Sequence, residues 1–114
     1  MNLEKVYHVA VYAPPTQVDA ILNGITAVTP LRYSNYEKVV WFSEPGTEQF
    51  QPATSANPAV GTPGKISRLP SVKIEFAIPR DLDLLKKVIT VGIYPHHPWE
   101  EPVIIVRKSW AVRK

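Results

Sequence analysis

Six stretches of patterned apolar residues follow one another in the order strand, helix, strand, strand, helix, strand. This order restricts the folds open to the chain more than any other feature. Alternation of β-branched or aromatic residues with other residues predicts strands at 6–12 and 72–78. Runs rich in apolar residues predict two further strands, at 36–42 and 103–106.

The two intervening stretches repeat apolar residues at helical spacing. Thr16 and Asp19 resemble an N-terminal capping pair for the first helix, which Pro30 should end. The second helix should begin at a capping Asp81 and end near Gly92. The stripes expected to be buried are Val18, Ile21, Leu22 and Ile25 in the first helix and Leu84, Leu85, Val88 and Ile89 in the second.

This order of elements predicts a single α+β domain over residues 1–114 with the ferredoxin-like βαββαβ arrangement. We expect a four-stranded antiparallel sheet with two helices on one face. Between the second and third strands lies a long Pro/Gly-rich excursion, Ser43–Leu69, which lacks any periodicity. We expect this excursion to be ordered and to cover an edge of the sheet, since exposed edges are commonly protected.

Composition narrows the class of protein. Hydrophobic residues make up 45% and charged residues 20% of the chain, as in soluble globular proteins. The absence of cysteine excludes disulfides, thiolate zinc sites and a cysteine nucleophile, and it fits a cytoplasmic protein. The start of the chain lacks the pattern of a signal peptide, and no apolar run is long enough to cross a membrane.

The net charge is +3, with four cations gathered at the C-terminal end, at Arg107, Lys108, Arg113 and Lys114. We expect these residues to form a solvated tail. Nucleic-acid binding is not favoured, because no aromatic and basic face accompanies the cations.

The segment His96–Pro102 concentrates more reactive groups than any other part of the chain: two imidazoles, two carboxylates and an indole. Its prolines suppress helix, so it should form a short extended connector that leads into the last strand. His97, Glu101 and His96 could bind a divalent transition metal, with His8 or a neighbouring subunit completing the ligand set. In the alternative interpretation, His97 and Glu101 hydrogen-bond to the backbone and fix the connector.

Several motifs in order along the chain also resemble a known family. They are Ser34–Tyr36, Gly46–Phe50, Ala56–Pro58, the paired Gly61 and Gly64, Glu75, and His97–Pro102. Together they resemble the insert domain of Nif3-like (NGG1-interacting factor 3-like) proteins and its free-standing relatives, some of which carry the label structural toxin protein RtxA. The domain is similar in fold to CutA and PII proteins. Where the family usually has Tyr in the last motif, this chain has Trp99.

The resemblance implies a ferredoxin-like subunit that self-associates, as CutA-like and PII-like trimers do, and it implies no established reaction. The metal-binding histidines of full-length Nif3-like proteins lie in flanking domains, so their metal site does not transfer to this chain. We therefore expect a non-enzymatic binding or regulatory module, dimeric or trimeric through its sheet edges, with a pocket for a small molecule or protein partner. The residues expected at the pocket are Asn57, Gly61, Gly64, Glu75, Trp99 and Glu100. A metal-binding or metal-tolerance protein is the alternative.

Overall fold

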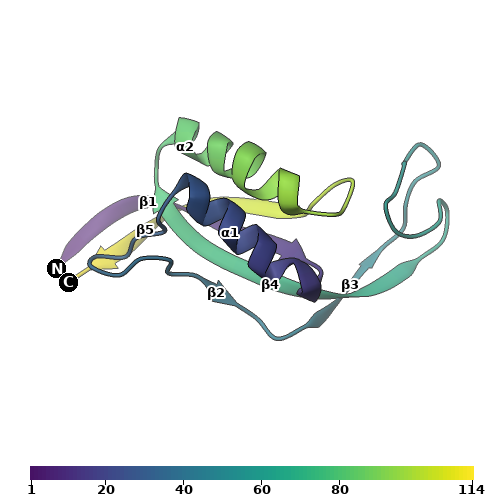
Figure 1. The fold of residues 1–114 in the computed structure, drawn as a ribbon, viewed down its shortest axis with the longest axis horizontal. Coiled ribbons are helices and arrows are strands. Elements are labelled where there is room, and N and C mark those ends of the chain that lie inside the picture. The colour runs from purple at the N-terminus through teal and green to yellow at the C-terminus, as the bar shows by residue number, and fades with distance from the viewer.

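The computed structural model describes all 114 residues and has the predicted order of elements (Figure 1). The strands and helices are β1 (Asn2–Ala13), α1 (Val18–Val28), β2 (Trp41–Phe42), β3 (Gly46–Phe50), β4 (Ser67–Pro79), α2 (Leu82–Lys87) and β5 (Ile104–Arg113). A 3-10 turn, Pro15–Gln17, precedes α1. The helix α2 continues as a π-helical segment, Val88–Ile93, and a 3-10 turn, Tyr94–His96. No helix is both long and apolar enough to span a membrane.

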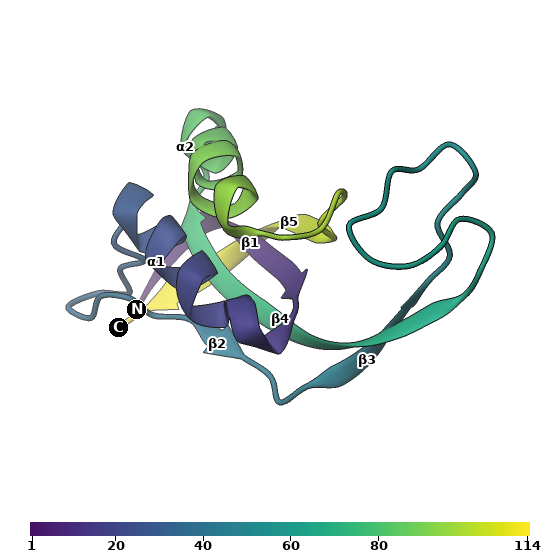
Figure 2. The same cartoon turned by 45° about the vertical axis from the view of Figure 1, so that its right-hand side comes forward.

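The strands form one antiparallel sheet in the order β2-β4-β1-β5, with β3 also paired to β4. Both helices cover the same face of this sheet (Figures 1 and 2). The α+β ferredoxin-like class is therefore confirmed. The sheet has five strands instead of four because the second strand position is divided into β2 and β3, with Pro45 between them. Proline cannot donate to a strand ladder.

The core lies between the sheet and the helices. Side chains alternate across a strand, so every second residue of β1 and β4 faces the helical layer. At the centre of the sheet, Val9 is paired with Phe76 on one side and Val106 on the other. The fully buried side chains of this core include Val9, Val11, Ile74, Ile78, Ile21, Ile25, Val88 and Ile93.

The sequence predicts an N-terminal cap for each helix. The structure confirms the cap of α2 but not that of α1. The Asp81 carboxylate accepts a 3.1 Å hydrogen bond from the Leu84 N–H, so the predicted cap of α2 is confirmed. The predicted capping pair of Thr16 and Asp19 is wrong. The 3-10 turn occupies residues 15–17, and α1 starts at Val18 with no capping side-chain hydrogen bond.

The helical layer packs very closely where α1 crosses the π-helical segment. A Cβ atom placed on Gly24 would clash with the carbonyl oxygen of Gly92 and with the ring of His96. A Cβ atom on Gly92 would lie 3.2 Å from the Gly24 carbonyl oxygen. Because neither position carries a side chain, the backbones of α1 and the π-helical segment can pack directly against each other.

The predicted strand 36–42 is mostly wrong, because only Trp41–Phe42 pairs with β4. The preceding segment turns back on itself at Leu31, Ser34 and Lys38, each of which has a positive φ that strands do not use. A 2.6 Å hydrogen bond from the Tyr33 hydroxyl to the carbonyl oxygen of Val112 fastens this segment to the end of β5.

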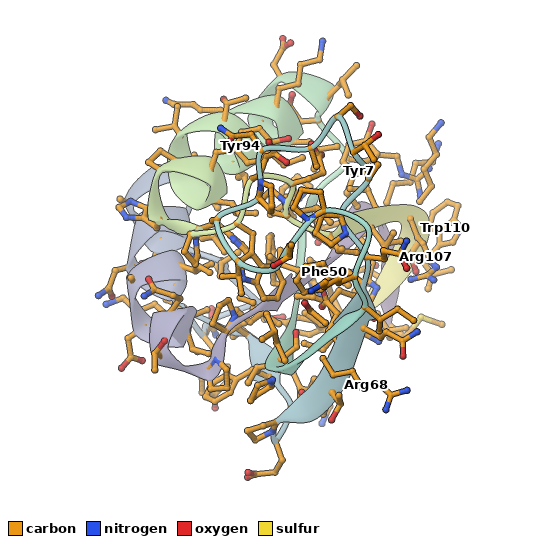
Figure 3. All side chains as sticks on the ribbon, turned by 90° about the vertical axis from the view of Figure 1, so that its right-hand side faces the viewer. Tyr7, Phe50, Arg68, Tyr94, Arg107 and Trp110 are labelled. Carbon is orange, nitrogen blue, oxygen red and sulfur yellow. The ribbon has the colours of Figure 1, made fainter.

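The predicted solvated tail is also wrong, because β5 runs to Arg113 and pairs with β1 along its length. The Arg113 Nε lies 2.9 Å from the Glu4 carboxylate, and its guanidinium lies 3.8 Å from the centre of the Tyr33 ring. These contacts hold Arg113 on the sheet, whereas Arg107 and Lys108 lie within β5 with exposed side chains. Arg107 and Trp110 project from β5 at the outer side of the molecule (Figure 3).

The long excursion is ordered, but it leaves the β5 edge of the sheet uncovered. Its first part pairs as β3 with residues 67–71 of β4, which makes a two-stranded arm that projects beyond the helices (Figure 1). From the tip of the arm, the loop 51–66 turns back toward the connector 97–103 (Figure 2). The loop therefore meets the His/Glu segment.

Candidate functional site

A cavity of about 250 Å³ lies where the arm, the loop and the connector meet. The arm contributes Glu48 and Phe50, and the connector contributes Trp99, Glu100 and Glu101. Because β3 side chains alternate, residues 48 and 50 share one face of the arm. The remaining wall is apolar. It consists of Val103, which directly precedes β5, and of the loop residues Pro52, Ala56, Pro58, Ala59 and Val60. Seen from the end of the arm, Phe50 lies within the outline of the loop (Figure 3).

His97 fixes the connector wall of the cavity. Its Nε2 lies 2.7 Å from the Tyr12 carbonyl oxygen, and the Trp99 N–H lies 3.2 Å from its Nδ1. Because a carbonyl can only accept, Nε2 carries the proton and Nδ1 is left to accept from Trp99. The neutral ring therefore bridges β1 and the connector. The ring centres of His97 and Trp99 are 5.1 Å apart.

The environment of His97 favours this neutral form. The residue is 8% exposed, and burial lowers its pKa below the usual 6.5. The hydrogen bond to Tyr12 and the negative charge of Glu48 act in the opposite direction, but burial outweighs them. His97 is thus suited to hold the backbone in place.

Two polar contacts tie the other walls together. The Asn57 N–H donates a 2.9 Å hydrogen bond to Oε2 of Glu100, which joins the loop to the connector across 43 residues of sequence. The Ser71 hydroxyl lies 3.1 Å from Oε1 of Glu48, which orients that carboxylate from β4. The cavity is therefore bounded by three segments that are linked directly to one another or to the sheet.

The structure brings together several residues that the sequence indicated. Asn57, Trp99 and Glu100 all lie at the cavity or contact one of its walls. Gly61 lies behind it, where an added Cβ would be 3.1 Å from the Phe50 ring. The N–H of Gly64 donates to the Pro52 carbonyl oxygen at 2.7 Å, which closes the base of the loop.

Glu75 does not join this group. It lies on the face of the sheet opposite the helices, where its carboxylate is 3.2 Å from Lys73 Nζ and 3.7 Å from His8 Nε2. The alternation that buries Ile74 and Phe76 turns Glu75 to this open face, and the loop does not reach it.

The structure does not bring the predicted metal ligands His96, His97 and Glu101 together within one chain. Both ring nitrogens of His97 are engaged by the backbone, and the exposed His96 belongs to the 3-10 turn beside Gly24. Glu101 lies at the cavity instead. No three His, Asp or Glu side chains in the chain are arranged to hold a metal ion. The arrangement of His97 corresponds to the alternative interpretation, in which the ring fixes the connector.

Sequence reasoning missed the contribution of the arm to this site. Glu48 and Phe50 were part of a motif, but nothing in the sequence placed them opposite Trp99. One feature of the sequence could have indicated it: Glu48 and Phe50 are two residues apart in a short strand, so their side chains share one face. A second hollow of about 660 Å³ on the open face of the sheet shares Glu48 and Phe50 and extends to Tyr12 and Lys73.

Comparison with known proteins relates the chain to part of a longer protein. No family model matches the sequence. A protein of Listeria innocua named GTP cyclohydrolase 1 type 2 homolog is 32% identical over 103 residues, which cover 86% of this chain and 26% of the relative. The chain thus spans about a quarter of the length of the curated relatives it matches.

Among solved structures, the chain is similar to part of a Nif3-related protein and, in fold, to smaller proteins. A Bacillus cereus protein related to NIF3 matches with a TM-score of 0.76 and 26% identity, over 96% of this chain and 27% of that one. CutA1 of Ehrlichia chaffeensis, a divalent ion tolerance protein, matches with a TM-score of 0.64 and 16% identity, over 93% and 82% of the two chains. CPII, a PII-like protein of Thiomonas intermedia K12, matches with a TM-score of 0.60 and 11% identity, over 99% of each chain. The last two likenesses concern the fold alone.

Proposed function

We propose that this chain, which is related to a domain-sized segment of the Nif3-related proteins and has the CutA-like and PII-like fold, is a non-enzymatic binding or regulatory module. Its ligand site is the cavity between the loop and the connector. The observation that carries the proposal is that two segments far apart in sequence enclose this cavity and are joined by the hydrogen bond between Asn57 and Glu100.

The chemistry of the cavity supports binding over catalysis. Its imidazole neighbour, His97, already uses both ring nitrogens for backbone hydrogen bonds, so it has no free nitrogen to move a proton. The aromatic and apolar walls with a few polar groups are typical of ligand pockets. The name of the longer relatives does not assign a GTP cyclohydrolase reaction to this chain, which matches 26% of the first relative's length.

Self-association through the sheet edge is the second part of the proposal. The strand β5 has β1 on one side and no strand on the other, so its outward row of backbone groups is open except at Val112, whose carbonyl oxygen accepts from the Tyr33 hydroxyl. Val106 and Val112 on this strand are 36% and 52% exposed, which adds apolar area to the open edge. A second or third copy would satisfy both the hydrogen bonds and the apolar surface. We propose a dimer or trimer that forms along β5.

Ligand binding can be tested with a library of small neutral, cationic and anionic fragments. We expect some of them to shift the indole N–H signal of Trp99 in ¹⁵N spectra and to leave that of Trp41, which is 58% exposed on β2, unchanged. Followed by isothermal titration calorimetry, Trp99→Leu should abolish the binding, whereas the matched Trp41→Leu should not. If no fragment acts on Trp99, or if Trp99→Leu binds normally, the cavity is not the ligand site.

Self-association can be tested by sedimentation velocity of the wild type and of Val106→Lys/Val112→Lys. Lysines on an edge strand oppose strand pairing, so the variant should sediment as a monomer where the wild type forms a dimer or trimer. Val91→Lys is the matched control, because Val91 is 53% exposed but lies on the π-helical segment. A monomeric wild type, or a variant that assembles normally, would reject the proposed edge.

A further inference from the structure

We infer that the cavity binds a small organic cation: an ammonium or guanidinium group carried on a compact apolar body. This inference rests on the proposed ligand-binding function and gives the chemical class of the ligand. The charge, the walls and the size of the cavity each support this class of ligand.

The charged groups at the cavity are all acidic. Glu48, Glu100 and Glu101 line it, and no Lys, Arg or His does. This contrasts with the chain as a whole, which carries 13 Lys and Arg residues and a net charge of +3. None of the three carboxylates takes part in an ion pair, because the ion pairs of the chain involve Glu4, Glu37 and Glu75. A cation could therefore pair with them without displacing a protein group.

The hydrogen-bonding groups at the cavity also disfavour an anion. The Asn57 N–H is already used by Glu100, and Glu48 accepts from Ser71. Among the side chains that line the cavity, the indole N–H of Trp99 is the one donor, and the three carboxylates accept hydrogen bonds and repel phosphate. The solved structure of CPII is of the protein bound to ADP, AMP and bicarbonate, so a nucleotide is the natural competing ligand to test.

The walls suit the apolar body of such a ligand. Phe50 from the arm and Trp99 from the connector both line the cavity, and six of its eleven lining residues are hydrophobic. Aromatic faces attract cations through the ring quadrupole, and Trp does so most strongly. Carboxylates beside aromatic rings can therefore hold the charge and the attached carbon skeleton of one molecule.

The size of the cavity limits the ligand to a small molecule. Its volume of about 250 Å³ is below the range of about 300–1,000 Å³ that is common for drug-sized ligands. An arylalkylamine or alkylguanidine of amino-acid size would fill it. Because the cavity is small and is bounded by the arm, the loop and the connector, we favour a free molecule over the side chain of a protein partner.

The test compares two probes that share an apolar skeleton but differ in charge, phenethylammonium and phenethyl alcohol, and adds the anionic nucleotide AMP as the competing ligand class. Each is titrated into the whole protein at neutral pH, and binding is followed by the Trp99 indole N–H signal. Phenethylammonium should bind about tenfold more tightly than the alcohol, and AMP should not bind.

Substitutions then assign the preference to the carboxylates. Glu100→Gln/Glu101→Gln should weaken phenethylammonium binding about tenfold and leave the alcohol unaffected. Glutamine retains an oxygen to accept from the Asn57 N–H, so the loop should stay in place. Glu101→Gln alone is the second variant, because Glu101 makes no hydrogen bond to the protein. The matched control is Asp19→Asn/Asp83→Asn, which removes two exposed carboxylates from the helices and should not change binding.

The outcomes separate this inference from the proposed function. Equal binding of the amine and the alcohol, or binding of AMP at Trp99, would overturn the cationic ligand class but leave the cavity as a binding site. The absence of any shift with all three probes would also overturn it, and the fragment library then decides whether the cavity binds anything. Nα-acetyl-lysine methylamide tests the source of the cation. If it bound as tightly as phenethylammonium, it would reject our preference for a free molecule.

Discussion

The imidazole of His97 donates a hydrogen bond from Nε2 to the carbonyl oxygen of Tyr12 at a distance of 2.7 Å. Tyr12 lies near the end of β1, a central strand of the sheet, so the hydrogen bond anchors the connector to the sheet. The same ring accepts the N–H of Trp99. One side chain thus sets the position of the aromatic wall of the cavity relative to the sheet.

Replacement of His97 by alanine should lower the free energy of unfolding by about 1–3 kcal/mol, because a buried carbonyl loses its partner and the ring leaves a space. Urea unfolding monitored by circular dichroism measures this. His96→Ala is the control, since that exposed ring makes no hydrogen bond, and its effect should stay within about 0.5 kcal/mol. Addition of zinc should not stabilise the wild type more than His97→Ala. A zinc effect that depends on His97 would restore the metal interpretation.

Stability should fall as the pH falls through the usual histidine range. Burial places the pKa of His97 in the folded chain below the usual 6.5, so the unfolded chain takes up a proton first. The contribution of His97 is therefore complete above that value and is lost at lower pH. Urea unfolding between about pH 8 and pH 5 should show a steeper loss for wild type than for His97→Gln. Parallel profiles for the two proteins would contradict the assignment.

Gly24→Ala should destabilise the protein although alanine favours helix. The added Cβ would meet the Gly92 carbonyl and the His96 ring, and overpacking of this kind costs about 1–3 kcal/mol. The gain in helix propensity is only about 1 kcal/mol. Thermal and urea unfolding give the net effect. Asn23→Ala, on the exposed side of the same helix, should be neutral or stabilising. If both variants behaved alike, the close approach of the two helices would be wrong.

The link between the loop and the connector should be visible in hydrogen exchange. Glu100→Ala removes the acceptor of the Asn57 N–H, so exchange at Asn57 should accelerate by up to about tenfold. Glu101→Ala removes an adjacent carboxylate that takes no part in this bond and should leave the Asn57 rate unchanged. Exchange measured residue by residue by NMR distinguishes the two. An unchanged rate in Glu100→Ala would mean that the loop is held by other contacts.

The sequence was sufficient for the order of elements, and the reason is visible in particular residues. The helical stripe of Val18, Ile21 and Ile25 is buried because its period matches the helix. The alternation at 72–78 places Ile74 and Phe76 in the core for the same reason, with a period of two. These patterns depend only on residues that are close in sequence, so the sequence alone is enough to predict them.

The features that the sequence concealed depend on partners far along the chain. The cations from Arg107 to Arg113 gave the last strand the composition of a tail, yet this segment pairs with β1, and Arg113 also contacts Glu4. Similarly, the sequence of the connector indicated that Trp99 would lie at a pocket. The opposite wall, at Phe50, depends on the direction in which the arm projects, and the sequence does not indicate that direction. Glu75 was assigned to the pocket through its motif, and its strand turns it to the other face.

The pairing of Asn2 with Arg113 puts the first and last strands side by side, so both ends of the chain lie together (Figure 1). A short linker could join them across one interstrand spacing of about 5 Å. The chain could then be reopened within the loop 51–66 as a circular permutant that keeps every strand pair of the sheet. Such a permutant would sever only the cavity wall, and it would reveal which properties of the molecule belong to the sheet and which to the loop.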